Sequence, residues 1–194
     1  MQPVRAWRQG CAHHRRARGH GAVIAAQMRT LGGGVALLCM SALAFAAPPA
    51  PALDRSGAVR IGQRFSELEP RAHWAPLNAG PLGQCGHVEG GLLPSGVAMM
   101  VEADRIVRFD VNDPGAVGPF GIQVGDSEAD ARARLPAGYS VQPHKYGRDG
   151  GNDLYLTWHD PQGGFAVRYE TGEGTVTSMY WGRWDAVQLV EGCA

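Results

Sequence analysis

Few of the side chains that could do chemistry in this sequence are spaced for it. Cys85 lies two residues before His87, a separation that a thiol–imidazole nucleophile could use. After residue 46, no two histidines have the i, i+4 spacing of a helical metal site, and no cysteine has a CxxC partner. The patterns GxSxG and HExxH and the phosphate loop do not occur either. We therefore predict no catalytic residue, no metal and no cofactor, although a metal site around His144 or His159 that forms only in the folded chain stays open.

The stretch PHKYGRDGGND, residues 143–153, concentrates polar and aromatic side chains on a glycine-rich loop. Binding residues gather on loops that a rigid sheet holds in place. We predict a ligand or partner surface here, with an ordinary solvated hairpin loop as the alternative. The predicted contact residues are His144, Tyr146, Arg148 and Asp149.

The stretch MYWGRW, residues 179–184, places aromatic side chains around an arginine. Tryptophan and tyrosine suit stacking on sugars and the centres of protein interfaces. In a strand over 175–181, alternate residues point to opposite faces, and both faces carry an aromatic side chain. We predict that Trp181, Arg183 and Trp184 form an exposed platform, with packing in the core or at a sheet edge as the alternative.

Residues 28–46 have the three parts of a secretory signal peptide. Arg29 supplies the positive charge, 35–45 is an apolar run shorter than the roughly 20 residues of a membrane span, and a small-x-small motif ends at Ala46. We predict cleavage after Ala46 and a periplasmic or secreted protein without a membrane span, the alternative being an N-terminal membrane anchor. Residues 1–27 hold five arginines and no acidic residue, and are predicted to be a mis-assigned upstream segment rather than a nucleic-acid-binding arm.

The predicted mature chain, residues 47–194, is acidic and has two cysteines. It holds 12 of the 18 basic residues and all 18 acidic ones, which gives a net charge of −6. This charge argues against nucleic acid as a partner. The two cysteines, Cys85 and Cys193, can form one disulfide in an oxidising compartment. We predict that bond, with two unpaired buried thiols as the alternative.

Turn residues and capping motifs divide the mature chain into predicted elements. Two S-x-x-[DE] motifs, at 66–69 and 127–130, predict the starts of two short helices. In chain order we predict a Pro- and Ala-rich spacer at 47–57, a short helix from Ser66, a loop over 75–96, a hairpin of strands 97–101 and 105–111, a linker at 112–119, a helix from Ser127 to about Leu135, and strands near 139–145, 153–159, 164–170, 175–181 and 186–190. The folded domain is therefore expected to span 58–194.

Apolar side chains alternate with mostly polar ones along the predicted strand 164–170. Phe165, Val167 and Tyr169 share one face, and Ala166, Arg168 and Glu170 share the other. A period of two is typical of a strand with one covered and one solvated face. We therefore expect one face of the sheet to be exposed to solvent.

The two halves of the domain, 58–111 and 119–194, follow one plan. Each has a strand end, a glycine, a capped helix, a loop and antiparallel strands. The proposed alignment matches Ile61-Gly62 with Val124-Gly125, 97–101 with 165–169, and Ile106 with Val176, and it matches Ser66 with Ser127 after a two-residue slip. A short helix and a hairpin bury little apolar surface alone, so packing two such units on one sheet would stabilise both.

The sequence Gly125-Asp126-Ser127 followed by a short amphipathic helix, and more loosely Gly62 to Ser66, resembles the start of a unit found in two groups of exported proteins. One group is the beta-lactamase-inhibitory protein family, which has tandem helix-plus-strands repeats. The other is the small outer-membrane-assembly lipoproteins, which have a single unit. The C-terminal GRWDAVQLVEGCA is similar to the ends of uncharacterised exported proteins of Gram-negative bacteria. The resemblance implies a tandem-repeat fold and an envelope location, and no inhibitory residue carries over to this chain.

These observations predict one α+β domain. We expect a curved antiparallel sheet with two short helices on one face, built from two imperfect helix-plus-strands repeats. The expected function is non-enzymatic binding of another envelope protein through the exposed sheet face and the 143–153 loop. The alternatives are a carbohydrate- or peptidoglycan-binding module that uses Trp181 and Trp184, and an envelope hydrolase.

Overall fold

The computed structural model of the protein describes residues 51–69, 73–77, 84–148 and 151–193. The predicted signal peptide and upstream segment, residues 1–46, lie outside the described residues. Asp149, one of the predicted contact residues, lies outside them as well.

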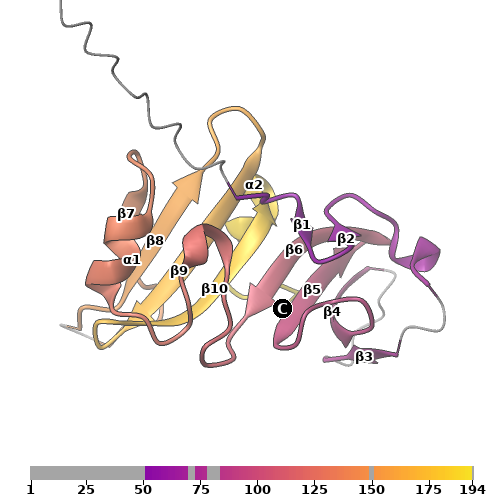
Figure 1. Ribbon diagram of the computed structural model, residues 1–194, viewed down its shortest axis with the longest axis horizontal. Coiled ribbons are helices and arrows are strands. Elements are labelled where there is room, and N and C mark those ends of the chain that lie inside the picture. Colours follow the sequence, from indigo (N-terminus) through magenta and orange to yellow (C-terminus); the bar gives the residue numbers. More distant parts are fainter. Residues whose placement is uncertain (1–50, 70–72, 78–83, 149–150, 194) are drawn as a thin grey trace, which may run out of the picture. The chain divides into compact units, whose positions relative to one another are not determined.

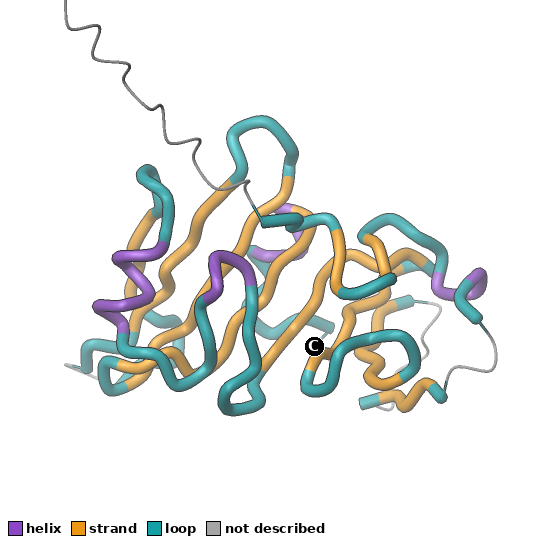
Figure 2. The backbone as a smooth tube through the Cα atoms, viewed as in Figure 1, coloured by secondary structure: helices purple, strands orange, loops and turns teal. Residues whose placement is uncertain are grey.

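Strands dominate the described part of the chain, and its helices are short (Figure 2). The strands are β1 (Arg55–Ser56), β2 (Val59–Arg60), β3 (Trp74–Pro76), β4 (Cys85–Gly90), β5 (Val97–Glu102), β6 (Arg105–Val111), β7 (Ser140–Pro143), β8 (Leu154–His159), β9 (Phe165–Gly172) and β10 (Thr175–Arg183). The helical elements are the 3-10 turns η1 (Phe65–Glu67) and η2 (Pro119–Gly121) and the α-helices α1 (Glu128–Arg134) and α2 (Trp184–Val187). The fold is therefore α+β, as predicted.

Eight of the strands form one antiparallel sheet in the order β3-β4-β5-β6-β10-β9-β8-β7. Strands β3 to β6 form one meander and β7 to β10 form another. The two meanders meet where β6 pairs with β10, with Asp110 opposite Tyr180. Strands β1 and β2 form a separate two-stranded sheet.

Several predicted elements are present at nearly their predicted positions. The hairpin of β5 and β6 turns at Ala103 and Asp104, both of which have positive φ (45° and 63°). Helix α1 is capped as its sequence predicts, because the Asp130 amide donates to Ser127 Oγ at 3.1 Å. The helix ends at Leu135, where Pro136 follows.

Other predictions about the elements are wrong. The predicted loop over 75–96 contains strand β4, whose only apolar residue facing the core is Val88. The helix predicted from Ser66 is the 3-10 turn η1, because the Ser66 hydroxyl and amide both donate to the Asp104 carboxylate (2.8 and 2.9 Å) instead of capping a longer helix. The fold also begins before residue 58, since Leu53 is buried.

The first face of the sheet carries the main hydrophobic core. Apolar side chains of the central strands pack there against Ala131 of α1 and Val59 of β2. The core residues contributed by β5, β6, β8, β9 and β10 include Val97, Met99, Val101, Ile106, Phe109, Val111, Leu156, Val167, Tyr169, Val176, Met179 and Trp181. Figure 1 shows α1 and the β1–β2 pair in front of the sheet, on this face.

The second face is covered as well, by α2 and the segment that follows it. Met100 and Val107 pack against Ala186, and Ala166 and Tyr180 pack against Val187. Helices α1 and α2 therefore lie on opposite faces of the sheet, with α2 behind it in Figure 1. The two helices predicted on one face, from Ser66 and from Ser127, correspond to η1 and α1, and Phe65 of η1 and Ala131 of α1 do pack on the same first-face core. Helix α2 was not predicted.

The prediction that one face of the sheet is exposed to solvent is also wrong, because Ala166 and Arg168 on that face are 0% and 3% exposed. The residues after 183 form α2 instead of the strand predicted near 186–190, and this helix fills the face.

The same backbone arrangement occurs before η1 and before α1. Gly62 N–H donates to Ile106 O (2.7 Å), and Gly125 N–H donates to Val176 O (2.8 Å). Both glycines have positive φ (86° and 100°), which glycine adopts without steric cost. Each helical turn is thereby tied to the last strand of its own meander.

Candidate functional site

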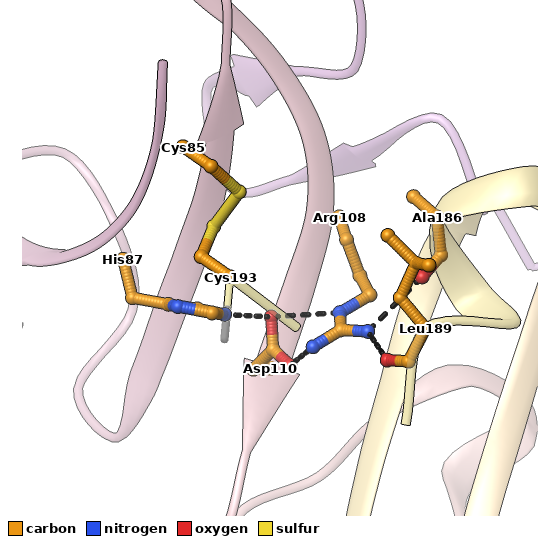
Figure 3. The surroundings of a disulfide bond; sticks show 7 residues. All are labelled: Cys85, His87, Arg108, Asp110, Ala186, Leu189 and Cys193. Atoms are coloured by element: carbon orange, nitrogen blue, oxygen red, sulfur yellow. Dashed lines mark hydrogen bonds and ion pairs between the residues drawn. A yellow bond between two sulfur atoms is a disulfide. The ribbon is translucent and has the colours of Figure 1, made fainter. Parts of the chain in front are cut away.

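The segment after α2, residues 188–193, is tied across the second face by a disulfide, and we call it the C-terminal strap. Cys193 bonds to Cys85, the first residue of β4, with the two Cα atoms 5.4 Å apart and 108 residues apart in sequence (Figure 3). The predicted disulfide is therefore present. Because Cys85 carries no free thiol, the thiol–imidazole pair with His87 does not exist in this oxidised state.

Arg108 joins the centre of the sheet to the strap. Its side chain is 3% exposed, and Nη1 donates to the carbonyl oxygens of Ala186 (3.0 Å) and Leu189 (2.5 Å). Nη2 lies 2.7 Å from a carboxylate oxygen of Asp110, on the same strand (Figure 3). A buried guanidinium is thus neutralised by one carboxylate and saturated by main-chain carbonyls.

His87 completes this group on the neighbouring strand. Its Nε2 lies 3.7 Å from the other carboxylate oxygen of Asp110 (Figure 3). Burial lowers the pKa of His87, the Asp110 charge raises it and the Arg108 charge lowers it further. Burial has the largest effect, so the imidazole is neutral at pH 7 and does not add a second positive charge beside Arg108.

A second polar group lies on the same face over β8, β9 and β10. The Tyr180 ring lies between Arg108 (4.5 Å from the guanidinium carbon to the ring centroid) and Arg168 (6.0 Å). The Tyr180 hydroxyl donates to Glu170 at 3.0 Å, and burial raises the pKa of this phenol. Ser178 Oγ donates to the other Glu170 oxygen at 2.8 Å.

These polar side chains satisfy one another. Within the described residues, every buried side-chain nitrogen or oxygen has a hydrogen-bond partner. The second face therefore carries a polar network, under the strap and α2, in which the described buried side chains satisfy one another.

The residues predicted on the 143–153 loop separate into two groups. His144 is largely covered, with Nε2 3.5 Å from Glu170 and its ring stacked 4.5 Å from the Tyr155 ring centroid, so it belongs to this polar network. Tyr146 is exposed, and so is Arg148, whose Nη2 lies 2.5 Å from Glu173 on the β9–β10 turn. His144 still contacts Tyr146, whose amide donates to His144 Nδ1 at 3.1 Å, so the predicted residues differ in exposure although they remain neighbours.

Arg148 lines a hollow of about 750 Å³ between the loop, the start of α1 and the β9–β10 turn, and we call it the α1–loop hollow. Its lining residues are Ser127, Glu128, Ala129, Arg132, Arg148, Gly151, Asn152, Asp153, Leu154, Glu173 and Gly174. Five of these are charged, three negatively and two positively. None is aromatic.

The charged side chains of the α1–loop hollow are held in place by one another. Arg132 Nε donates to Glu128 at 2.7 Å along α1. The Asp153 carboxylate accepts from the amides of Glu173 (3.2 Å) and Arg148 (3.4 Å), and these hydrogen bonds lower the pKa of Asp153. The arrangement presents paired charges of both signs at the surface.

Sequence reasoning found only one side of this hollow. That side is the loop with Arg148. Glu128 and Arg132 have the i, i+4 spacing that supports exposed ion pairs on a helix, but we did not predict them as part of a site. Glu173 had no such signal, because only the pairing of β8 with β9 brings its turn to the loop. Arg108 and Asp110 were also missed, although two charged residues inside the otherwise apolar stretch 106–111 indicate a buried polar group.

The predicted aromatic platform is not assembled. Trp181 is 4% exposed, packs 5.5 Å from the Phe109 ring and donates from Nε1 to Arg55 O at 3.2 Å, so the prediction that it is exposed is wrong. Trp184 is 39% exposed and stacks on His159 with ring centroids 4.4 Å apart. Arg183 is exposed and pairs with Asp185.

In the ranges that the structure describes, no group of three or more His, Cys, Asp or Glu side chains is placed to hold a metal ion. No helix in those same ranges is long and apolar enough to cross a membrane. Comparisons of this chain with protein-family models, with curated proteins and with solved structures gave no match.

Proposed function

We propose that this protein is an exported, non-enzymatic binding protein that contacts another protein of the cell envelope through the α1–loop hollow. The observation that carries the proposal is the set of charged side chains of both signs that line this hollow. Arg148 pairs with Glu173, and Arg132 pairs with Glu128. Tyr146 projects from the same loop and is 58% exposed. Tyrosine and arginine are enriched in protein interfaces, and charges of both signs can select a partner of complementary charge.

The proposed export rests on two independent features. The apolar run before Ala46 has the form of a signal peptide. The disulfide between Cys85 and Cys193 favours an oxidising compartment, because thiols are kept reduced in the cytosol. Both features support a periplasmic or secreted location.

A protein partner is favoured over a sugar by the aromatic residues. Carbohydrate modules stack sugars on exposed aromatic rings. Trp181 is in the core, the lining of the α1–loop hollow has no aromatic side chain, and Trp184 is covered on one side by His159. A single half-exposed tryptophan offers little stacking area.

Catalysis in this hollow has weak support. A general acid requires a carboxyl group whose pKa is raised toward neutrality. Hydrogen bonds from two backbone amides lower the pKa of Asp153 instead. A hydrolase is therefore the least supported of the three functions considered.

A photo-crosslinking experiment, combined with a charge-swapped variant, tests the proposed interface. We would express residues 47–194 in the oxidised form with a photo-crosslinking side chain at Tyr146 and, as a matched control, at Glu102 on the exposed end of β5. Exposure to an envelope extract should give a crosslinked protein from position 146 and none from position 102.

The variant Arg148→Glu with Glu173→Arg keeps the internal ion pair and inverts the local charges. We expect it to lose the crosslinked partner while its circular dichroism is unchanged. Equal crosslinking from both positions, or full retention by the swapped variant, would refute the proposed surface. Retention of peptidoglycan fragments without protein would instead favour the carbohydrate function.

We also infer that the two meanders are copies of one unit. Strand β5 pairs Val97 with Val111, and β9 pairs Val167 with Trp181, so the register between hairpin strands is equivalent in both. An irregularity interrupts each pairing at matching positions, after Ile106 in β6 and after Val176 in β10. This register differs by two positions from the alignment of 97–101 with 165–169 expected from the sequence.

The inferred copies are related by a two-fold axis between Asp110 and Tyr180. Met179 pairs with Val111 and Trp181 pairs with Phe109, which are equivalent pairs on the two sides of this position. Superposing 97–111 on 167–181 should require a two-fold rotation and should align the two irregularities. Irregularities at unrelated positions would contradict the duplication.

A further inference from the structure

We propose that the C-terminal strap is a redox-released cover: reduction of Cys85–Cys193 by a dithiol lifts residues 188–193 from the second face while the rest of the fold stays intact. The proposal concerns a different surface from the α1–loop hollow and does not depend on the function proposed there. Three observations support it: the contacts that hold the strap, the hollows that the strap borders, and a main core that contains no residue of the strap.

The noncovalent contacts of the strap are polar and partly exposed to solvent. Arg168 Nη2 donates to the side-chain oxygen of Gln188 at 2.9 Å. Lys145 pairs with Glu191 at 2.9 Å, but both side chains are about half exposed, and exposed ion pairs contribute little to stability. Leu189 is 44% exposed, so its side chain does not anchor the segment in the core. The strongest noncovalent contact is the hydrogen bond from buried Arg108 Nη1 to the Leu189 carbonyl at 2.5 Å. The disulfide is the one covalent tie between the strap and the sheet, and it holds the strap at its far end.

The strap lies between two hollows instead of filling one. A hollow of about 440 Å³ lies on the Lys145 side, and it is bounded by Lys145 and residues 188–192 of the strap. A hollow of about 320 Å³ lies on the other side, bounded by His87, Arg108 and Asp110 and by Val190 and Glu191 of the strap. Except for Lys145, the larger hollow is lined by the strap itself, so it disappears when the strap moves. The smaller hollow keeps His87, Arg108 and Asp110 and loses the strap residues Val190 and Glu191, so it widens into an open groove.

The main core does not need the strap. The first-face core contains side chains from β2, β4, β5, β6, β8, β9, β10 and α1, and no residue of 188–193 belongs to it. Cys85 and Cys193 only border the small cluster of Met100, Val107 and Ala186 on the second face. Helix α2 remains held by its own buried residues, Ala186 and Val187. Opening should therefore stop at residue 188.

The chemistry is an ordinary thiol–disulfide exchange. A thiolate of the dithiol attacks one sulfur of the Cys85–Cys193 bond, which gives a mixed disulfide and releases the other cysteine as a thiolate that takes up a proton. The second thiol of the reductant then attacks the mixed disulfide and leaves as the oxidised, cyclic disulfide. Cys85 and Cys193 are reduced by two electrons in total, and the dithiol is oxidised by the same two. Both cysteines are partly exposed, so a reductant can reach them.

Opening changes what the sheet presents to solvent. Arg108 Nη1 keeps the Ala186 carbonyl as an acceptor and loses the Leu189 carbonyl. The His87–Asp110 pair, now at the wall of the smaller hollow, becomes part of an open groove. The result is a surface that carries a guanidinium donor, an imidazole and a carboxylate in a row.

Hydrogen exchange and histidine labelling test the proposal directly. Oxidised residues 47–194 would be compared with the same protein after dithiothreitol reduction and iodoacetamide alkylation, which prevents reclosure. We expect amide exchange in 188–193 to become severalfold faster, while β5, β6, β9 and β10 exchange at their original rates. Diethylpyrocarbonate should modify His87 severalfold faster, and exposed His159 should serve as the internal reference with no change.

The double variant Cys85→Ser with Cys193→Ser separates opening from the effect of the alkyl groups. It should reproduce the fast exchange of the strap and the labelling of His87 without added reductant. Two outcomes would overturn the proposal. Unchanged exchange of 188–193 after reduction would mean that the polar contacts hold the strap, and loss of protection across all strands would mean that the disulfide is needed by the whole fold.

Discussion

Arg108 Nη1 lies 2.5 Å from the carbonyl oxygen of Leu189, so a guanidinium on a central strand holds the C-terminal strap against the sheet. The same side chain neutralises Asp110 and covers the Tyr180 ring. One buried cation therefore links the two meanders to the end of the chain. Its removal has consequences for all three of its neighbours.

Substitution of Arg108 by alanine should lower the free energy of unfolding by about 3 kcal/mol, because Asp110 loses its buried counter-charge and two main-chain carbonyls lose a donor. Urea unfolding of oxidised residues 47–194 measures the change. Arg60→Ala, which breaks an exposed pair with Asp54, is the matched control and should cost less than about 1 kcal/mol. Equal effects of the two substitutions would contradict a structural role for the buried pair.

His87 should make the protein less stable as the pH falls below neutrality. Burial lowers its pKa in the folded state, so the unfolded chain takes up the proton first, at about pH 6.5. The stability that the neutral imidazole contributes is present above that pH and is lost as the pH falls through the lower, folded-state pKa.

Unfolding free energies measured between pH 7.5 and about pH 5 test this linkage. His87→Gln should remove most of the decline over that window, since glutamine does not titrate. His159→Gln, at an exposed position stacked on Trp184, should leave the decline in place. If the free energy of unfolding of His87→Gln fell with pH as steeply as that of the unsubstituted protein, the titration of His87 would not cause the decline. The Asp110 charge, which raises the pKa of His87, would then offset burial and the Arg108 charge, which lower it.

The tryptophans of β10 and α2 should differ sharply in their effect on stability. Trp181→Ala removes a ring packed on Phe109 and should cost about 3–5 kcal/mol, whereas Trp184→Ala removes a half-exposed ring and should cost about 1 kcal/mol or less. Thermal and urea unfolding of both variants measure this difference. A mild effect of Trp181→Ala would place that side chain outside the core.

The sequence predicted local structure better than it predicted which surfaces are free. The β5–β6 hairpin and the capped helix α1 depend on turn and capping residues within a few positions of each other, and both were found. The face that carries Ala166 and Arg168 was predicted to be exposed to solvent. The alternation of apolar and polar residues along a strand does not reveal that a segment distant in sequence covers one face. That cover is α2 and the strap after it, held by the buried residues Ala186 and Val187, by Arg108 and by the disulfide to Cys85.

The candidate site was half predictable for the same reason. Arg148 and Tyr146 follow from the composition of one loop, but Glu173 reaches Arg148 from a turn 25 residues away. Trp181 was misplaced because both faces of β10 carry an aromatic ring, and the period of two does not say which face is the core.

Gly182, the one glycine of β10, should not tolerate a side chain. Its φ is 153°, and a Cβ there would lie 2.4 Å from Val107 O and 2.8 Å from the Cα of Arg108, both of which are backbone atoms of the paired strand β6. Neither atom can move without separating the two meanders, so Gly182→Ala should lower the free energy of unfolding by about 3 kcal/mol. Gly164→Ala is the control, since its φ is also positive (66°) but no atom lies within 4 Å of the added Cβ, and it should cost only about 1 kcal/mol. Urea unfolding separates the two cases, and similar costs would mean that backbone conformation alone, and not the close approach of β6 to β10, requires glycine at 182.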